Sequence, residues 1–230
     1  MITTTKAPLI SSWVHSFEDY QAMFDLTDTE FDRKILDYPA TVSSFNAEML
    51  KAGYDKVISA DPHYDLEPMD MLKHVDNVIQ RLATQLHHYA NRIHTEGEKT
   101  LEDILALSNQ YAQIFVTDYS QGLIENPYQV AHLPHLPFAD FQFELDLCAD
   151  LVFRNETDLP QLAIMELCRI THEVRIFPLL DEQGKVLDTL DPLILTLQEK
   201  NYGIEVRKVP YKLQRGSNAM LRLWARECVL

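Results

Sequence analysis

Acidic side chains follow each of the first two apolar strands that the sequence predicts. Asp37 ends the segment Lys34–Asp37, and Asp61 comes directly after Lys56–Ala60. A third acid, Asp150, follows a later apolar run. Carboxylates in such places can accept hydrogen bonds from ligand hydroxyls, and Asp150 could also act as a general base or orient a substrate. The plain alternatives are a turn acid, an acid at a helix N-terminus and a loop acid.

Alternating strands and helices must position these acids. Ser43 and Ser44 can cap a helix over residues 45–52 that Gly53 ends, so the first two strands and this helix form one βαβ unit. Further strands are expected at 128–131, within 143–153 and at 173–178, and further helices at 158–171 and from 191 to about 203. The last two strands, 204–209 and 220–224, have no helix between them and must be antiparallel.

This order predicts an α/β fold with a doubly wound, mainly parallel seven-stranded sheet, an antiparallel C-terminal strand pair and helices on both faces. In such sheets, ligands bind beyond the carboxyl ends of the strands. Five residues fall at or just after predicted strand ends and are expected to line one crevice: Asp37, Asp61, Leu133, Cys148 and Asp150. Cys148 could equally be a small residue buried in the core.

Two long helical stretches interrupt the alternation. Apolar residues recur at helical spacing from 69 to about 94 and from 101 to 115. A single crossover between two parallel strands needs fewer helical residues than these two stretches contain. Residues 66–123 are therefore predicted to form a helical insertion or lid. Residues 1–30 are predicted to be an N-terminal helical extension, and the whole chain, 1–230, a single domain. Tyr119 would either contact a substrate as part of the lid or pack in the core.

The composition restricts the partners and the compartment. The 230 residues carry a formal charge of −15 and no basic run, which argues against nucleic acid and anionic membranes as partners. The three cysteines are widely spaced, with no CxxC pair, as expected in a reducing cytoplasm. We expect neither a signal peptide nor a membrane span, and the histidines at 63, 74, 87, 88 and 94 lack the spacing of a metal site.

Several segments, in the same order along the chain, resemble the motifs of class I S-adenosylmethionine-dependent methyltransferases. They are Ile35–Asp37, Val57–Asp61, His132–Phe138, Phe143–Cys148 and, in the late strands, Arg175–Pro178 and Val209–Gly216. The resemblance spans roughly residues 30 to 225. It implies a Rossmann-like methyltransferase fold and a bacterial subgroup of that family.

The same resemblance implies S-adenosylmethionine as the cofactor. By this resemblance, Asp61 would accept hydrogen bonds from the ribose hydroxyls, and Asp37 would hold the amino-acid end. It also implies cofactor contacts for the neighbouring residues Tyr38, Pro39, Ala40, Pro62, Leu133 and Cys148. Methyl transfer depends on aligning the acceptor with the sulfonium carbon more than on acid–base catalysis. The lack of an evident catalytic constellation is therefore no objection.

The first turn departs from the family pattern because it contains no glycine. Family members place glycines after the acid, where they allow positive φ and close approach of a ligand. Residues 38–43 here read Tyr-Pro-Ala-Thr-Val-Ser. Pro39 lacks a donor N–H, and a β-branched residue at positive φ would be an outlier. Because S-adenosylmethionine has no pyrophosphate, the demand for glycine is weaker than in a dinucleotide site.

The sequence therefore predicts methyl transfer from S-adenosylmethionine to a small molecule or a protein side chain. The alternative is a non-catalytic binding or scaffold protein that keeps the fold without the cofactor. A nicotinamide oxidoreductase is disfavoured because the dinucleotide fingerprint is absent. Arg215 could contact an anionic substrate or pair with a surface acid, and the sequence leaves the oligomeric state open.

Overall fold

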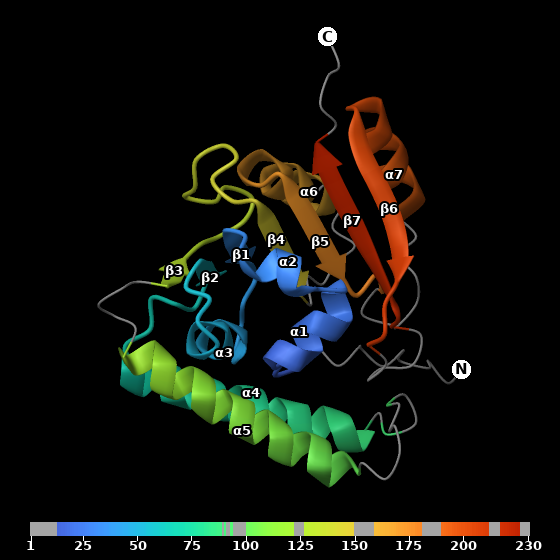
Figure 1. The fold of residues 1–230 in the computed structure, drawn as a ribbon. Coiled ribbons are helices and arrows are strands. Elements are labelled where there is room, and N and C mark those ends of the chain that lie inside the picture. The colour runs from blue at the N-terminus through green and yellow to red at the C-terminus, as the bar shows by residue number, and fades with distance from the viewer. Residues whose placement is uncertain are drawn as a thin grey trace.

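A seven-stranded sheet forms the centre of the molecule (Figure 1). The computed structural model describes residues 13–88, 90, 93, 100–121, 127–149, 159–180, 190–211 and 217–225. The strands are β1 (Ile35–Asp37), β2 (Val57–Asp61), β3 (Tyr128–Val130), β4 (Leu145–Ala149), β5 (Glu173–Phe177), β6 (Tyr202–Lys208) and β7 (Ala219–Ala225). Their order in the sheet is β3-β2-β1-β4-β5-β7-β6.

The strand pairing confirms the predicted fold class. β1 pairs in parallel with β2 and with β4, and Asp37 lies opposite Ser59 on one side and Leu147 on the other. β5 is parallel to β4, whereas β7 is antiparallel to both β5 and β6. The chain moves outward in one direction from β1 and in the other from β4. The topological switch point, where ligands bind in such sheets, therefore lies between β1 and β4.

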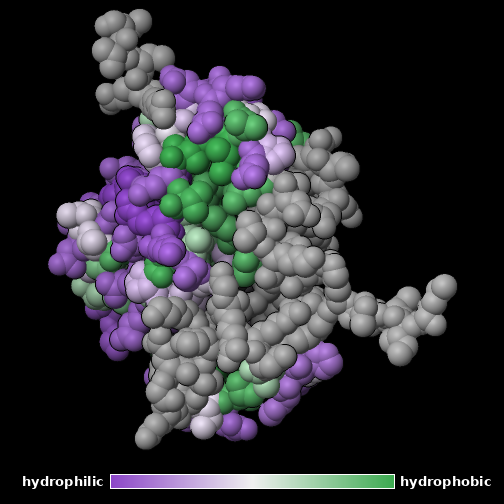
Figure 2. Space-filling view, turned by 90° about the vertical axis from the view of Figure 1, so that its right-hand side faces the viewer, coloured by the Kyte–Doolittle hydropathy of each residue, from purple (hydrophilic) through white to green (hydrophobic). Residues whose placement is uncertain are grey.

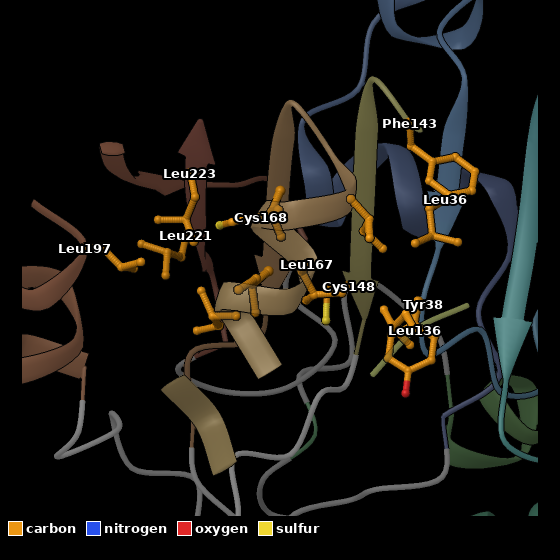
Figure 3. Close-up of a cluster of buried hydrophobic side chains, with 14 of the residues drawn as sticks. Leu36, Tyr38, Leu136, Phe143, Cys148, Leu167, Cys168, Leu197, Leu221 and Leu223 are labelled. Carbon is orange, nitrogen blue, oxygen red and sulfur yellow. The ribbon is translucent and has the colours of Figure 1, made fainter. Parts of the chain in front are cut away.

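Helices cover both faces of the sheet. α1 (Phe17–Phe24), α2 (Asp28–Phe31) and α3 (Phe45–Lys51) contribute to the core that also holds Ile35 and Leu145. α6 (Leu159–Ile170) and α7 (Leu190–Glu199) pack on the other face, where Figure 3 shows Leu167 and Cys168 near residues of the strands. Because successive strand residues point to opposite faces, Asp37 faces the α1–α3 layer and Tyr38 faces the other core.

The two long helices between β2 and β3 are α4 (Pro68–His88) and α5 (Leu101–Gln121). They run side by side across the end of the molecule toward which the parallel strand β5 points (Figure 1). Their shared core includes Met71 and Phe115 and also takes in Ala40, Val42 and Tyr64 from the turns after β1 and β2. The hairpin is thus packed directly on the turn that contains no glycine.

A network of ion pairs joins α2 to the antiparallel side of the sheet. Arg175, in β5, is buried and donates to Glu173 at 2.7 Å and to Glu30 at 2.8 Å. Arg222, in β7, donates to Glu173 at 2.8 Å, and Arg33 lies 3.2 Å from the same carboxylate. Glu30 also completes the predicted capping box with Thr27. The network fastens the N-terminal helices to strands that come about 140 residues later in the chain.

Several element boundaries differ from those predicted. β4, at Leu145–Ala149, confirms the buried strand expected within 143–153, of which residues 150–153 lie outside the described residues, whereas β6 begins two residues earlier than expected, at Tyr202. The N-terminal extension contains α1, and Ser16 and Asp19 form a capping box at the N-terminus of this helix. This capping box was not predicted from the sequence. No helix in the described part of the chain is both long enough and apolar enough to cross a membrane.

Candidate functional site

The turn after β1 adopts a left-handed backbone conformation at Thr41, with φ of 49°. Such a conformation is unfavourable for a β-branched residue, and it persists only where the surroundings hold it. Both backbone polar groups of Thr41 are held. Its N–H donates to Asp61 at 3.0 Å, and its carbonyl accepts from the hydroxyl of Tyr64 at 2.8 Å. The turn therefore takes a shape that favours glycine without containing one.

Asp61 stands at the carboxyl end of β2, where the sequence predicts a ribose-binding acid. Only 4 % of its side chain is exposed. Besides the bond from Thr41 to Oδ2, Oδ1 accepts from the backbone N–H of His63 at 2.8 Å, and Nδ1 of the His63 ring lies 2.9 Å from the same oxygen. Asp61 is thus the link between the first turn and the loop that leads into α4.

His63 places an exposed ring beside this acid. Its side chain is 56 % exposed, and the ring stacks on that of His74, in α4, with centroids 4.4 Å apart. Burial and the neighbouring His63 lower the pKa of His74 below its ordinary value. Across the described ranges, no three His, Cys, Asp or Glu side chains gather in a way that could hold a metal ion.

Asp37 lies inside the protein beneath the switch point. Its side chain has no exposed surface, and it accepts hydrogen bonds from the hydroxyls of Tyr20 at 2.7 Å and Ser59 at 3.0 Å. Burial raises the pKa of Asp37 to about 7, although these two hydrogen bonds oppose the rise. The structure thus puts Asp37 below the turn and bonded to α1 and β2, and contact with a cofactor's amino-acid end stays a prediction.

A second fully buried acid, Asp146, lies in β4 opposite Leu36. Neither of its carboxylate oxygens has a hydrogen-bond partner among the residues that the structure describes. Burial, reinforced by the charge of Asp37, raises the pKa of Asp146 well above its ordinary value. Asp146 and Asp37 therefore lie at the centre of the sheet, and no arginine or lysine of the described residues is paired with either of them.

The remaining predicted residues surround this centre in different ways. Tyr38 is buried in the hydrophobic cluster of Figure 3. Its hydroxyl accepts the N–H of Leu133, which links the first turn to the loop after β3. Burial raises the pKa of Tyr38 to about 12. Cys148 is fully buried in β4. Ala40 is also buried, whereas Pro39, Pro62 and Leu133 are half-buried.

Tyr119 has a structural tie to the loop after β2. Its hydroxyl donates to the carbonyl groups of Tyr64 at 3.1 Å and Leu66 at 2.9 Å, and its ring is buried. These bonds fix α5 to that loop. Asp150 and Arg215, the other residues predicted to act on a substrate, lie outside the described residues.

The donor and acceptor set around Asp61 can be compared with the needs of an adenosyl group. A carboxylate offers about four lone-pair positions. Thr41 uses one and His63 uses two, which leaves one on Oδ2 for a ribose hydroxyl. For Asp61 to accept hydrogen bonds from both ribose hydroxyls, the exposed His63 ring must move away from it. Asp61 thus has a free acceptor position for one ribose hydroxyl, and a second becomes free when the His63 ring changes position.

Sequence reasoning missed three contributors to this region: Tyr20, Ser59 and Asp146. The first two are ordinary strand and helix residues whose partner is chosen by tertiary packing. Asp146 did leave a signal, because an acid stands in the middle of the apolar run from Phe143 to Cys148. An acid at a position buried on both faces of a sheet is uncommon and is a candidate for function.

Comparisons with known proteins give distant matches, and no family model matches the chain. The uncharacterized protein MJ0045 of the archaeon Methanocaldococcus jannaschii is 28 % identical over 211 residues, which cover 90 % of this chain and 92 % of that protein. This relative gives no support to the predicted bacterial source.

Solved structures with a similar shape include three from thermophiles. The PH0226 protein of Pyrococcus horikoshii aligns with a TM-score of 0.45 and 13 % identity over 85 % of this chain and 82 % of its own. PH1948 of the same organism, to which RNA methyltransferase activity is ascribed, has a TM-score of 0.47 and 12 % identity, over 93 % and 82 %. A SAM-dependent methyltransferase of Thermotoga maritima has a TM-score of 0.42 and 9 % identity, over 92 % and 90 %.

The strand order and the placement of the helices identify the fold class of the chain. Five parallel strands and a parallel edge strand β6 are joined by a single antiparallel strand, β7, inserted between β5 and β6. Helices cover both faces, and acids end β1 and β2 at the switch point. The chain therefore has the class I methyltransferase-like α/β fold that the order of its motifs implies.

Proposed function

We propose that the protein transfers a methyl group from S-adenosylmethionine to a small molecule or a protein side chain. The observation that carries the proposal is the position of Asp61: a carboxylate at the tip of β2, next to the turn after β1, in a sheet of the methyltransferase-like order. The activity ascribed to similar folds in other organisms supports this assignment.

Each residue near the switch point has a defined part in this proposal. Asp61 accepts a ribose hydroxyl on its remaining lone pair, and a second once the His63 ring has moved. Asp61 and Tyr64 hold Thr41, and with it the turn after β1, in the left-handed shape. When bound, the cofactor supplies the electrophilic methyl group. The protein's own task is to align the acceptor and exclude water.

The net charge of −15 makes a nucleic acid the less suitable acceptor, because phosphate recognition depends on clusters of Lys and Arg. The arginines that lie together in the described structure, such as Arg175 and Arg222, are already paired with Glu173. A small molecule or a protein side chain remains the acceptor that the composition favours.

A second function, that of a non-catalytic binding protein, is favoured by one observation. Ala40 and Val42, which belong to the turn in which the family has glycines, are buried in the core of the α4–α5 hairpin. The turn has thereby gained a packing role that a ligand site does not require. In this alternative, Asp61 serves only to hold Thr41 and the following loop.

Binding of S-adenosylhomocysteine to the full chain separates the two functions. At a ligand concentration about 100 times Kd, a single site stabilises the folded state by about 2.7 kcal/mol, which raises Tm by about 5–10 °C in a protein of this size. We expect such a rise, and calorimetric titration should give one site per chain. A flat response to both S-adenosylhomocysteine and S-adenosylmethionine favours the binding protein.

Two variants and one control locate the site. Asp61→Asn keeps an acceptor for Thr41 but loses the charge, and it should weaken binding about tenfold or more. His63→Ala removes the competing ring donor and should tighten binding. Asp65→Asn changes an exposed acid in the same loop and should leave the affinity unchanged. Equal affinities in all three would place the ligand elsewhere.

A further inference from the structure

β6 forms one edge of the sheet and has an unused side. Within the residues that the structure describes, it pairs with β7 along all seven residues and with no other strand. An edge of this length presents a row of backbone N–H and C=O groups that can pair with another chain. The opposite edge, β3, has only three residues, Tyr128–Val130, and is much less suited to such pairing.

Apolar side chains gather beside this edge. Val206, in β6, is 52 % exposed, and Leu195, in α7, is 61 % exposed. Val206 lies on the same face of the strand as Ile204, which packs against the core beneath α7. Figure 2, which views the molecule from the side of β6 and α7, shows a hydrophobic area with hydrophilic surface above it and to its left. Such areas mark interaction sites.

Two of the three charged side chains on β6, Glu205 and Arg207, pair with each other, and the third, Lys208, is exposed at the end of the strand. Exposed edge strands are commonly blocked by unpaired charged side chains. Here the guanidinium of Arg207 donates to both carboxylate oxygens of Glu205, at 3.0 and 2.9 Å, on the face away from α7. Glu205 and Arg207 thus pair along the strand, in the order acid–valine–base, and each has a further partner: Asp25 lies 2.8 Å from Arg207, and Arg222 lies 3.5 Å from Glu205.

We propose that β6 pairs antiparallel with β6 of a second copy of this chain, with Val206 opposite Val206 on the two-fold axis. In this register, Glu205 of each copy lies opposite Arg207 of the other, and the four charges alternate. Registers centred on Glu205 or Arg207 would place like charges directly opposite each other, which destabilises a sheet. The charge order of the strand thus selects both the partner and the register.

The proposed pairing makes one continuous sheet across two chains. Strand-to-strand hydrogen bonds supply the attraction, and the two Val206 side chains and the neighbouring α7 surfaces cover each other. A two-fold axis perpendicular to the sheet makes the parallel strands of the two copies run in opposite directions. The candidate cofactor sites therefore lie at opposite ends of the assembly, and the dimer leaves both of them open.

The first test compares substitutions on the two edges of the sheet. The full chain should sediment with twice the mass of the 26.6 kDa monomer. Val206→Lys puts like charges on the axis and should raise the dimer Kd about 100-fold or more. Val130→Lys, on the edge strand β3 with 39 % exposure, is the matched control and should remain dimeric. A wild-type chain that stays monomeric up to about 100 μM overturns the proposal.

The second test fixes the register. In a Cys228→Ser background, oxidation should cross-link Val206→Cys to itself, because residues opposite each other have Cα atoms within disulfide range. Ile204→Cys should not cross-link, since four residues of strand, about 13 Å, separate it from its counterpart. A dimer that forms through Ile204→Cys, or is unaffected by Val206→Lys, contradicts the proposed interface.

Discussion

Buried and half-buried carboxylates lie in two regions around the sheet and have opposite surroundings. Under β5 and β7, Glu173 and Glu30 are surrounded by arginines. Burial opposes the ionisation of both, but hydrogen bonds and charges, from Arg222 and Arg175 at Glu173 and from Thr27 and Arg175 at Glu30, lower each pKa to about 2. At the switch point, Asp37 and Asp146 have no arginine or lysine paired with them in the described structure, and their pKa values are raised.

The two groups of acids therefore have different roles: one holds elements together through ion pairs, and the other consists of acids whose pKa values are raised by burial. The arginine-rich region satisfies every acid it contains, so its charges hold elements together and leave nothing for a ligand. The switch-point acids are kept close to neutral by burial, and such acids concentrate where proteins bind and react. The two regions should therefore respond in opposite directions to the loss of a partner, to pH and to replacement by an apolar side chain.

Loss of a buried arginine should have the largest effect. Arg175→Met leaves Glu173 and Glu30 short of their cation, and breaking a buried pair in this way costs about 3–5 kcal/mol. Urea denaturation of the full chain measures the loss. The matched control is Lys73→Met, whose exposed side chain pairs with the exposed Asp70. It should cost about 1 kcal/mol or less, and equal losses would erase the distinction between core and surface pairs.

The pH dependence of stability should have two limbs of opposite sign. Glu30 and Glu173, with lowered pKa values, add stability that is present above about pH 4.5 and lost as pH falls toward 2. Asp37 binds its proton more tightly when folded, so its contribution is full below about pH 4 and is lost as pH rises through 7. The loss is on the order of 4 kcal/mol, since one pKa unit corresponds to about 1.4 kcal/mol.

Asp37→Asn isolates the second limb. The amide oxygen can still accept from Tyr20, and the amide N–H₂ can donate to the Ser59 hydroxyl, so the geometry is kept. Unfolding free energies of this variant should decline less between pH 5 and 8 than those of the wild type, and the decline that remains belongs to Asp146, whose pKa is also raised. A variant that declines as the wild type does would show that another group carries the effect.

Replacement of an unpartnered acid should raise stability. Asp146→Val removes two carboxylate oxygens that have no hydrogen-bond partner in the described residues, and we expect a gain of about 1–3 kcal/mol at pH 7. The same change at Glu173, which has several partners, should destabilise the protein. Thermal and urea denaturation of both variants test the contrast, and a destabilised Asp146→Val would reveal a partner for this acid.

The smallest effect is expected at the turn. Thr41→Gly relieves a left-handed conformation that costs a non-glycine residue about 1–2 kcal/mol, although the unfolded glycine gains entropy. The net gain should be about 1 kcal/mol, with the hydrogen bond to Asp61 retained. Thr41→Val, which keeps the branching, should give no such gain in the same denaturation assay.

Much of the sheet could be predicted from local signals. Alternating apolar runs, the serines before α3 and the glycine after it placed β1, α3 and β2 within a residue or two. Strand ends share an edge in a parallel sheet, so Asp37 and Asp61 could be brought together from sequence alone. The capping box at Thr27 and Glu30 could also be predicted from the sequence, because its partners are three residues apart.

The rest depends on contacts between distant segments. Nothing near Glu30 indicates that its second oxygen binds Arg175, 145 positions later. Likewise, the inward turn of Asp37 depends on Tyr20, which a separate helix brings to it. Thr41 in a left-handed conformation contradicts local preference and is explained only by Asp61 and Tyr64. Tertiary hydrogen bonds therefore decided the features that local patterns could not.

Ala40 and Val42 couple the α4–α5 hairpin to the turn after β1. Since their side chains are part of the hairpin's core, the two helices cannot lift as an independent flap. Any outward swing would pull the segment after β1 along with it and strip the Thr41–Asp61 contact. Opening at this end of the molecule and reshaping of the turn after β1 are consequently coupled.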